Sequence, residues 1–99
     1  MTFLLESVSV DTDGTAVNAD GSNKTLCVWG TDFGGGTVSI EGSPDNGTTW
    51  ILLQLINGAD AQFTANTFKV IDRLGQGTLI RATLTSSSGA DDVNAALFQ

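Results

Sequence analysis

The sequence lacks histidine and tyrosine, and it has one cysteine and one proline in 99 residues. Without histidine, the commonest general base near neutral pH is missing, and a zinc site loses one of its usual ligands. The single cysteine, Cys27, excludes a disulfide within the chain, and no neighbouring residue would activate it as a nucleophile. We therefore expect no enzymatic activity, no catalytic residue, no metal site and no cofactor.

Positive charge is also scarce. The basic residues are Lys24, Lys69, Arg73 and Arg81, and the formal net charge is −7. Nucleic acids and anionic membrane surfaces both need clustered Lys or Arg on the protein that binds them. Signal-peptide and membrane-spanning patterns are missing as well. We therefore expect neither nucleic acid nor membrane as a partner, and a chain that is made and folded in a cytoplasm.

The sequence does contain many short strand-like runs. Val38 and Ile40 alternate with Ser39 and Glu41 in a period of two, which is typical of a strand with one buried face. Clusters of Gly, Asn, Asp and Ser separate the runs. The runs cover residues 3–11, 24–30, 37–41, 50–55, 63–71, 78–86 and 93–98. They predict an all-β fold: an antiparallel β-sandwich, jelly-roll-like, with about seven short strands.

We expect residues 1–99 to form one domain, in which residues 1–10 are either an extended docking arm or an edge strand. Cys27 lies in an apolar run and is expected to be a small core residue. A second run is almost entirely apolar, and two alternatives remain open for it: burial in the core, or contact with another chain. Its apolar residues are Leu52, Leu53, Leu55 and Ile56.

Two patterns suggest ligands, and each has a simpler alternative. Asp11 and Asp13 lie in a stretch, residues 11–15, that is faintly like a calcium loop, but the further oxygen ligands and late Glu of an EF-hand are missing. A solvated acidic turn is the favoured interpretation. Trp29, Phe33 and Trp50 are candidates for a platform that stacks on sugars. The favoured alternative is that the tryptophans anchor the core, because each adjoins an apolar run.

Residues 43–50 form a polar turn between two strand-like runs, which predicts a β-hairpin. Ser43 and Asp45 have side-chain oxygens that can bond turn amides, and Gly47 supplies a positive φ. Trp50 opens the return strand and can cover the turn. The octapeptide resembles the Asp-box hairpin, S-x-D-x-G-x-x-W, which is a structural turn in sialidases and other β-proteins. The resemblance implies a structural role for these four residues.

Longer segments are similar to small proteins of tailed-bacteriophage structural gene clusters. The similar segments are residues 30–50, 74–85 and 94–97, within a match over residues 24–99. This resemblance implies a non-enzymatic virion protein made in the host cytoplasm. We expect it to be a capsid decoration (cement) protein that bridges neighbouring subunits. The resemblance also implies a homo-oligomer, most simply a homotrimer, with the major capsid protein or another virion protein as partner. The alternative is a carbohydrate- or receptor-binding β-module on the tail or surface.

Overall fold

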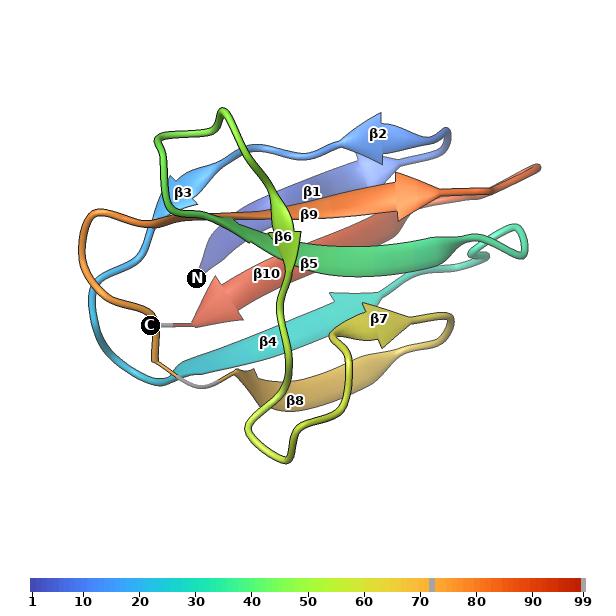
Figure 1. Ribbon diagram of the computed structural model, residues 1–99. Helices are drawn as coiled ribbons and strands as arrows, with labels where there is room; N and C mark the ends of the chain where they lie inside the picture. The colour runs from blue at the N-terminus through green and yellow to red at the C-terminus, as the bar shows by residue number, and fades with distance from the viewer. Residues whose placement is uncertain (72, 99) are drawn as a thin grey trace.

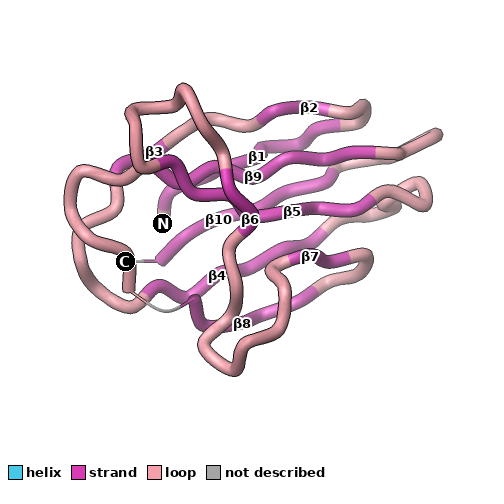
Figure 2. The backbone as a smooth tube through the Cα atoms, in the orientation of Figure 1, coloured by secondary structure: helices cyan, strands magenta, loops and turns pink. Residues whose placement is uncertain are grey.

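A computed structural model describes residues 1–71 and 73–98, and these contain strands, turns and loops but no helix (Figure 2). The strands form two antiparallel layers (Figure 1). Their bounds are β1 Thr2–Val8, β2 Thr12–Asp13, β3 Val17–Asn18, β4 Lys24–Trp29, β5 Thr37–Ser43, β6 Ile51–Leu52, β7 Gln62–Phe63, β8 Thr67–Ile71, β9 Leu79–Thr85 and β10 Val93–Phe98. In the part of the chain described here, no helix is long and apolar enough to cross a membrane.

The order of the strands confirms the jelly-roll-like sandwich. One sheet has the order β1-β10-β4-β8. The other has the order β2-β9-β5-β6, in which β3 also pairs with β9 and β7 also pairs with β5. If β2 with β3, and β6 with β7, each count as one interrupted strand, the two sheets have four positions each. The chain changes sheet at almost every step, as it does in a jelly roll of two Greek keys.

The expected number of about seven strands is wrong, because residues 1–71 and 73–98 form ten. Strands β2 and β3 fall in a stretch without a predicted strand, and a glycine-containing segment separates them. The run at residues 63–71 divides into the end of β7 and the whole of β8. The run at residues 50–55 contributes only Ile51–Leu52 as a strand. Two-residue strands are too short to show a period-two pattern, so the sequence could not reveal them.

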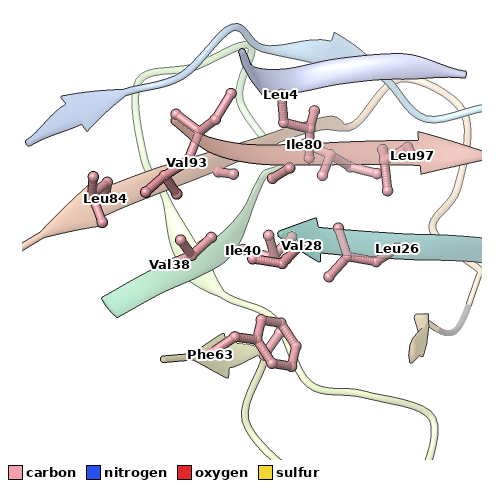
Figure 3. Packing of buried hydrophobic residues seen from close by; sticks show 14 of the residues in the cluster. Leu4, Leu26, Val28, Val38, Ile40, Phe63, Ile80, Leu84, Val93 and Leu97 are labelled. Carbon is pink, nitrogen blue, oxygen red and sulfur yellow. The ribbon is translucent and has the colours of Figure 1, made fainter. Parts of the chain in front are cut away.

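The core lies between the two sheets and consists mainly of aliphatic side chains (Figure 3). Leu26 and Val28 of β4 point toward the sheet that contains Val38 and Ile40 of β5, and all four are fully buried (Figure 3). The intervening residues point outward, as the pleat of a strand requires. The alternation predicted for β5 therefore matches the side that faces the core.

Strand β1 is the outer strand of its sheet and pairs with β10 from Thr2↔Leu97 to Val8↔Val93. Residues 2–8 are therefore an edge strand of the domain. Leu4 and Leu5 are both buried, because the pairing register shifts between Phe3 and Leu5 and interrupts the alternation. The N-terminus and the end of β10 lie at the same end of the sandwich (Figure 1).

The segment between β2 and β3 joins the two sheets along one side of the sandwich. The amide of Gly14 donates to Ala82 O in β9 at 2.8 Å, and the amide of Thr15 donates to Leu4 O in β1 at 2.9 Å. A Cβ added to Gly14 would overlap both of these carbonyl oxygens. The chain can therefore pass between the sheets here only because residue 14 has no side chain.

Candidate functional site

The Asp-box-like hairpin follows β5 and satisfies its polar groups internally. Ser43 Oγ donates to Asp45 Oδ1 at 2.9 Å and accepts from the Gly47 amide at 2.8 Å. Asp45 Oδ1 also accepts from the Thr49 amide at 2.7 Å. Gly47 has a φ of 93°, which a glycine adopts without strain. Hydrogen bonding from Thr49, with a smaller contribution from Ser43, lowers the pKa of Asp45, so its carboxylate stays charged and holds the turn.

The fourth residue of the motif, Trp50, lies against a cation on the second sheet. The guanidinium of Arg81 is 4.2 Å from the centroid of the Trp50 ring, a cation–π contact. Arg81 Nε also donates to Glu41 Oε1 at 2.8 Å, and these two residues are paired across β5 and β9. The hairpin therefore brings Ser43, Asp45 and Gly47 together in one turn and fixes Trp50 beside it. These contacts support the turn and supply no reactive group.

The candidate interface run divides between the inside and the outside of the domain. Leu55 is buried in the core, and Leu53 packs against the core. Leu52 is half-buried, whereas Ile56 is 59% exposed. The structure therefore spreads the four residues over different environments, and of the four only Ile56 offers a largely open side chain.

The acidic residues of the calcium-like stretch bind different protein groups. Asp11 accepts from the Ser86 and Ser87 amides and from Ser87 Oγ, and these bonds, the Ser87 hydroxyl first, lower its pKa. Asp13 Oδ2 instead lies 3.9 Å from Arg81 Nη1, which makes an ion pair. Within residues 1–71 and 73–98, no three His, Cys, Asp or Glu side chains are grouped so that they could hold a metal ion.

The three aromatic residues considered for sugar stacking do not share a surface. Trp29 lies on β4 and contacts the ring of Phe3, with centroids 5.8 Å apart. Trp50 covers Arg81 on the other sheet, and Phe33 is buried in the core. A single platform built from Trp29, Phe33 and Trp50 is therefore not present.

The structure instead reveals an apolar surface that sequence reasoning missed, on the outer side of the β1-β10-β4-β8 sheet. We call it the aromatic face. It consists of Phe3, Thr25, Cys27, Trp29, Phe68, Val70, Ala96 and Phe98. Strand pairing places four of these in one row across the sheet: Phe3↔Ala96, Ala96↔Cys27 and Cys27↔Phe68. The four strands come from distant parts of the sequence, and the row exists only once all four have paired.

Large side chains flank small ones on this face. Phe3 and Trp29 contact each other on one side, and Phe68 and Phe98 contact each other on the other, with centroids 6.4 Å apart. Ala96 is fully buried although it lies outside the core cluster, which fits a position beneath the neighbouring rings. Phe68 is 67% exposed and Phe98 is 41% exposed. The face therefore presents aromatic surface to solvent, at a cost of about 25 cal/mol for each Å² of apolar area.

The outer side of the other sheet has the opposite character. Its paired rows on β5 and β9 are polar or charged: Thr37↔Thr85, Ser39↔Thr83 and Glu41↔Arg81. An antiparallel sheet with one solvated side normally shows this polar pattern. The contrast between the two outer surfaces singles out the aromatic face, because large exposed apolar patches mark sites of contact with other molecules.

Cys27 lies on the aromatic face and not in the core. It was expected in the core, but this is wrong: the side chains of Leu26 and Val28 point inward, so Cys27 points outward and is only half-buried. Burial nevertheless raises the pKa of its thiol, which disfavours the reactive thiolate. One signal could have revealed this surface. Residues 93–98 are apolar at nearly every position, which indicates a strand covered on both sides.

The surface of the described residues also has two hollows. An open groove of about 550 Å³ lies at one end of the sandwich, between residues 30–35 and 64–66. Two of its polar side chains bond to the protein itself: Asp32 Oδ1 accepts from the Gly34 amide at 2.7 Å, and Asn66 Oδ1 accepts from the Gly30 amide at 2.9 Å. A smaller apolar hollow of about 190 Å³ lies beside the hairpin, between Leu53 and Leu74. Neither groups side chains in a way that suggests a reaction.

The chain matches no model of a protein family, no curated protein and no solved structure.

Proposed function

We propose that this chain is a non-enzymatic structural protein of a tailed-phage virion, where it decorates and stabilises the capsid through contacts with neighbouring protein subunits. The observation that carries the proposal is the aromatic face. Its exposed rings, Phe68 and Phe98, belong to regular strands of a sheet, so the apolar surface is held in place by the fold. A rigid apolar surface of this kind is suited to permanent assembly.

The rest of the molecule is consistent with a scaffold. Strand β5, the hairpin and β9 contain most of the segments that resemble phage structural proteins, and they form the centre of the polar sheet. Jelly rolls occur in viral capsid proteins and also in lectins, so the fold alone does not choose between them. Asp45 in the hairpin, and Asp32 and Asn66 in the end groove, each accept a hydrogen bond from the protein's own main chain, which favours the structural role over sugar binding.

The mechanism is mechanical. A subunit that covers apolar area on two neighbours at once adds interface to a shell, and the shell must expose that area again before its subunits can separate. Apolar area contributes about 25 cal/mol per Å², so a few hundred Å² on each neighbour amounts to several kcal/mol before the costs of association. The negative charge of the chain keeps unassembled copies soluble.

Particles of the phage that encodes this chain provide the test. We expect mass spectrometry of purified virions to detect the chain in many copies per particle, and electron microscopy to place it on the outer surface of the head. Particles made without its gene should assemble but lose DNA at a lower temperature, and added purified chain should restore their stability. Absence of the chain from purified virions would refute the proposal, as would tight binding to a glycan array by a chain that never binds particles.

A further inference from the structure

We propose that the aromatic face is closed by a second copy of this chain, in a two-fold dimer that packs the two β1-β10-β4-β8 sheets against each other. The inference names a second copy as the partner of the surface described above, so that a dimer, and not a single chain, would be the unit that contacts the shell. It rests on the proposed function only in taking this surface to be a protein interface. It differs from the sequence-based expectation of a homotrimer through residues 52–56, a run in which Leu55 is buried.

The aromatic face carries its most exposed ring at one edge and its small residues in the middle. Along the central row, the small residues Ala96 and Cys27 lie between the rings of Phe3 and Phe68. Phe68 projects from the edge strand β8 and is 67% exposed, whereas Cys27 beside it is half-buried and short. In the proposed dimer, the exposed Phe68 ring of one copy would pack against the rings and the half-buried Cys27 of the other. A two-fold axis repeats the same contact in the opposite direction, as an isologous interface requires.

The available area suits a small homodimer. Strands lie about 4.8 Å apart and rise about 3.4 Å per residue, so four strands of about five residues present roughly 350 Å² in projection. The rings stand above the plane of the sheet and the residues at its rim add further contact, so the accessible area is larger than the projection. Two faces would bury roughly 1,000 Å² in total, which is the lower limit for a specific interface. We therefore expect a dissociation constant in the micromolar range. The sheets would pack as they do inside a sandwich, about 10 Å apart.

The distribution of charge favours contact between like chains on this side. Each copy carries a formal charge of −7, so most ways of bringing two copies together place carboxylates against each other. The residues of the aromatic face are uncharged. On the same strands, Lys24 and Lys69 pair with the inward-facing Ile71 and Leu26, whereas the exposed Glu6 follows the buried Leu5 on the edge strand β1 and lies at the rim of the face. Homodimer interfaces are more apolar than other protein interfaces and have few charges at their centre, and the aromatic face has the same composition.

Sedimentation analysis of the purified chain from low micromolar to millimolar concentration tests the proposal. We expect the mass to rise from one chain to two. Phe68→Asp should shift the midpoint at least 30-fold to higher concentration, because it places two carboxylates in the interface. Thr85→Asp is the matched control, since Thr85 is exposed on the outer side of the other sheet. Thr85→Asp should change the concentration at the midpoint of dimerisation by less than threefold. Thermal melts of both variants verify folding, and Phe68 is exposed enough that its variant should fold.

Cys27 supplies a second, independent readout, because it is the only thiol and lies in the proposed interface. A short bismaleimide should link two wild-type chains, and Phe68→Asp should abolish that product. A Cys27→Ser, Thr85→Cys double variant should give little product. A chain that remains monomeric at millimolar concentration overturns the proposal, as does a trimer, or a dimer that Phe68→Asp leaves intact. If a monomeric wild type binds particles and Phe68→Asp does not, the face belongs to a shell protein, and the proposed function stands without the dimer.

Discussion

Substitution of Gly14 by alanine should destabilise the sandwich strongly. A Cβ at this position would lie 2.6 Å from Ala82 O and even closer to Leu4 O. Both oxygens belong to the main chain of paired strands, so neither can rotate away. The backbone of residues 13–15 must move outward, and the hydrogen bonds of Gly14 and Thr15 to the two sheets are strained or lost. Two such bonds contribute about 2 kcal/mol, and overpacking adds about 1–3 kcal/mol. We expect a loss of about 3–5 kcal/mol in the free energy of unfolding.

For a domain of this size, each kcal/mol corresponds to about 4–8 °C in Tm, so Gly14→Ala should lower Tm by at least about 12 °C. Differential scanning calorimetry on wild type and variant measures this. Gly75→Ala is the matched control, because an added Cβ there has no neighbour within 4 Å and its φ lies outside the left-handed region. It should leave Tm unchanged or raise it slightly. If Gly14→Ala melted within 3 °C of wild type, the close approach of residue 14 to the carbonyl oxygens of Leu4 and Ala82 would be refuted.

Three further outcomes are expected. Asp45→Ala should lower Tm without changing self-association or particle binding. Thr48→Ala in the same turn is the control and should leave Tm, self-association and particle binding unchanged. Lost binding of Asp45→Ala at unchanged Tm would contradict the structural role of the turn. Hydrogen bonds lower the pKa values of Asp11, Asp20 and Asp45 below their ordinary value of 3.8, so their stabilising contribution is complete above that pH and disappears as pH falls through the lowered values. Urea melts between pH 2 and pH 7 should show this loss below about pH 4, and Asp11→Asn with Asp45→Asn should reduce it; equal slopes in variant and wild type would refute this assignment. Millimolar calcium should leave Tm within 1–2 °C, and a rise of many degrees would show that the acidic stretch at residues 11–15 binds metal.

The sequence predicted the features that depend on local patterns. Val38 and Ile40 alternate with polar residues and indeed point into the core, and Ser43 and Asp45 form the turn that their side chains favour. Such features need only a few neighbouring residues, because period and turn chemistry operate over that range. The class of fold followed from the number and spacing of these segments.

The features that escaped prediction depend on partners far away in the sequence. The sequence left open whether Leu55 lies in the core or at the surface. Leu55 lies in the core because it forms a β-bridge to Ile71, which is 16 residues further along the chain. Strand β2 has two residues and exists through its pairing with β9. The aromatic face needs the registers of four strands, so Cys27 could not be placed beside Phe68 until the pairing of β4 with β8 was known.

The position of β10 governs when the protein can fold. This strand lies between β1 and β4, and its Leu97 pairs with Thr2 across almost the whole length of the sequence. During synthesis, β1 leaves the ribosome well before β10 and has no partner on this side until β10 has been made. Contacts so distant in sequence make folding slow, commonly in milliseconds to seconds. A nascent or truncated chain that lacks Val93–Phe98 cannot complete its first sheet, and it cannot form the aromatic face. Any contact that the aromatic face makes therefore becomes possible only after β10 has been synthesised and paired.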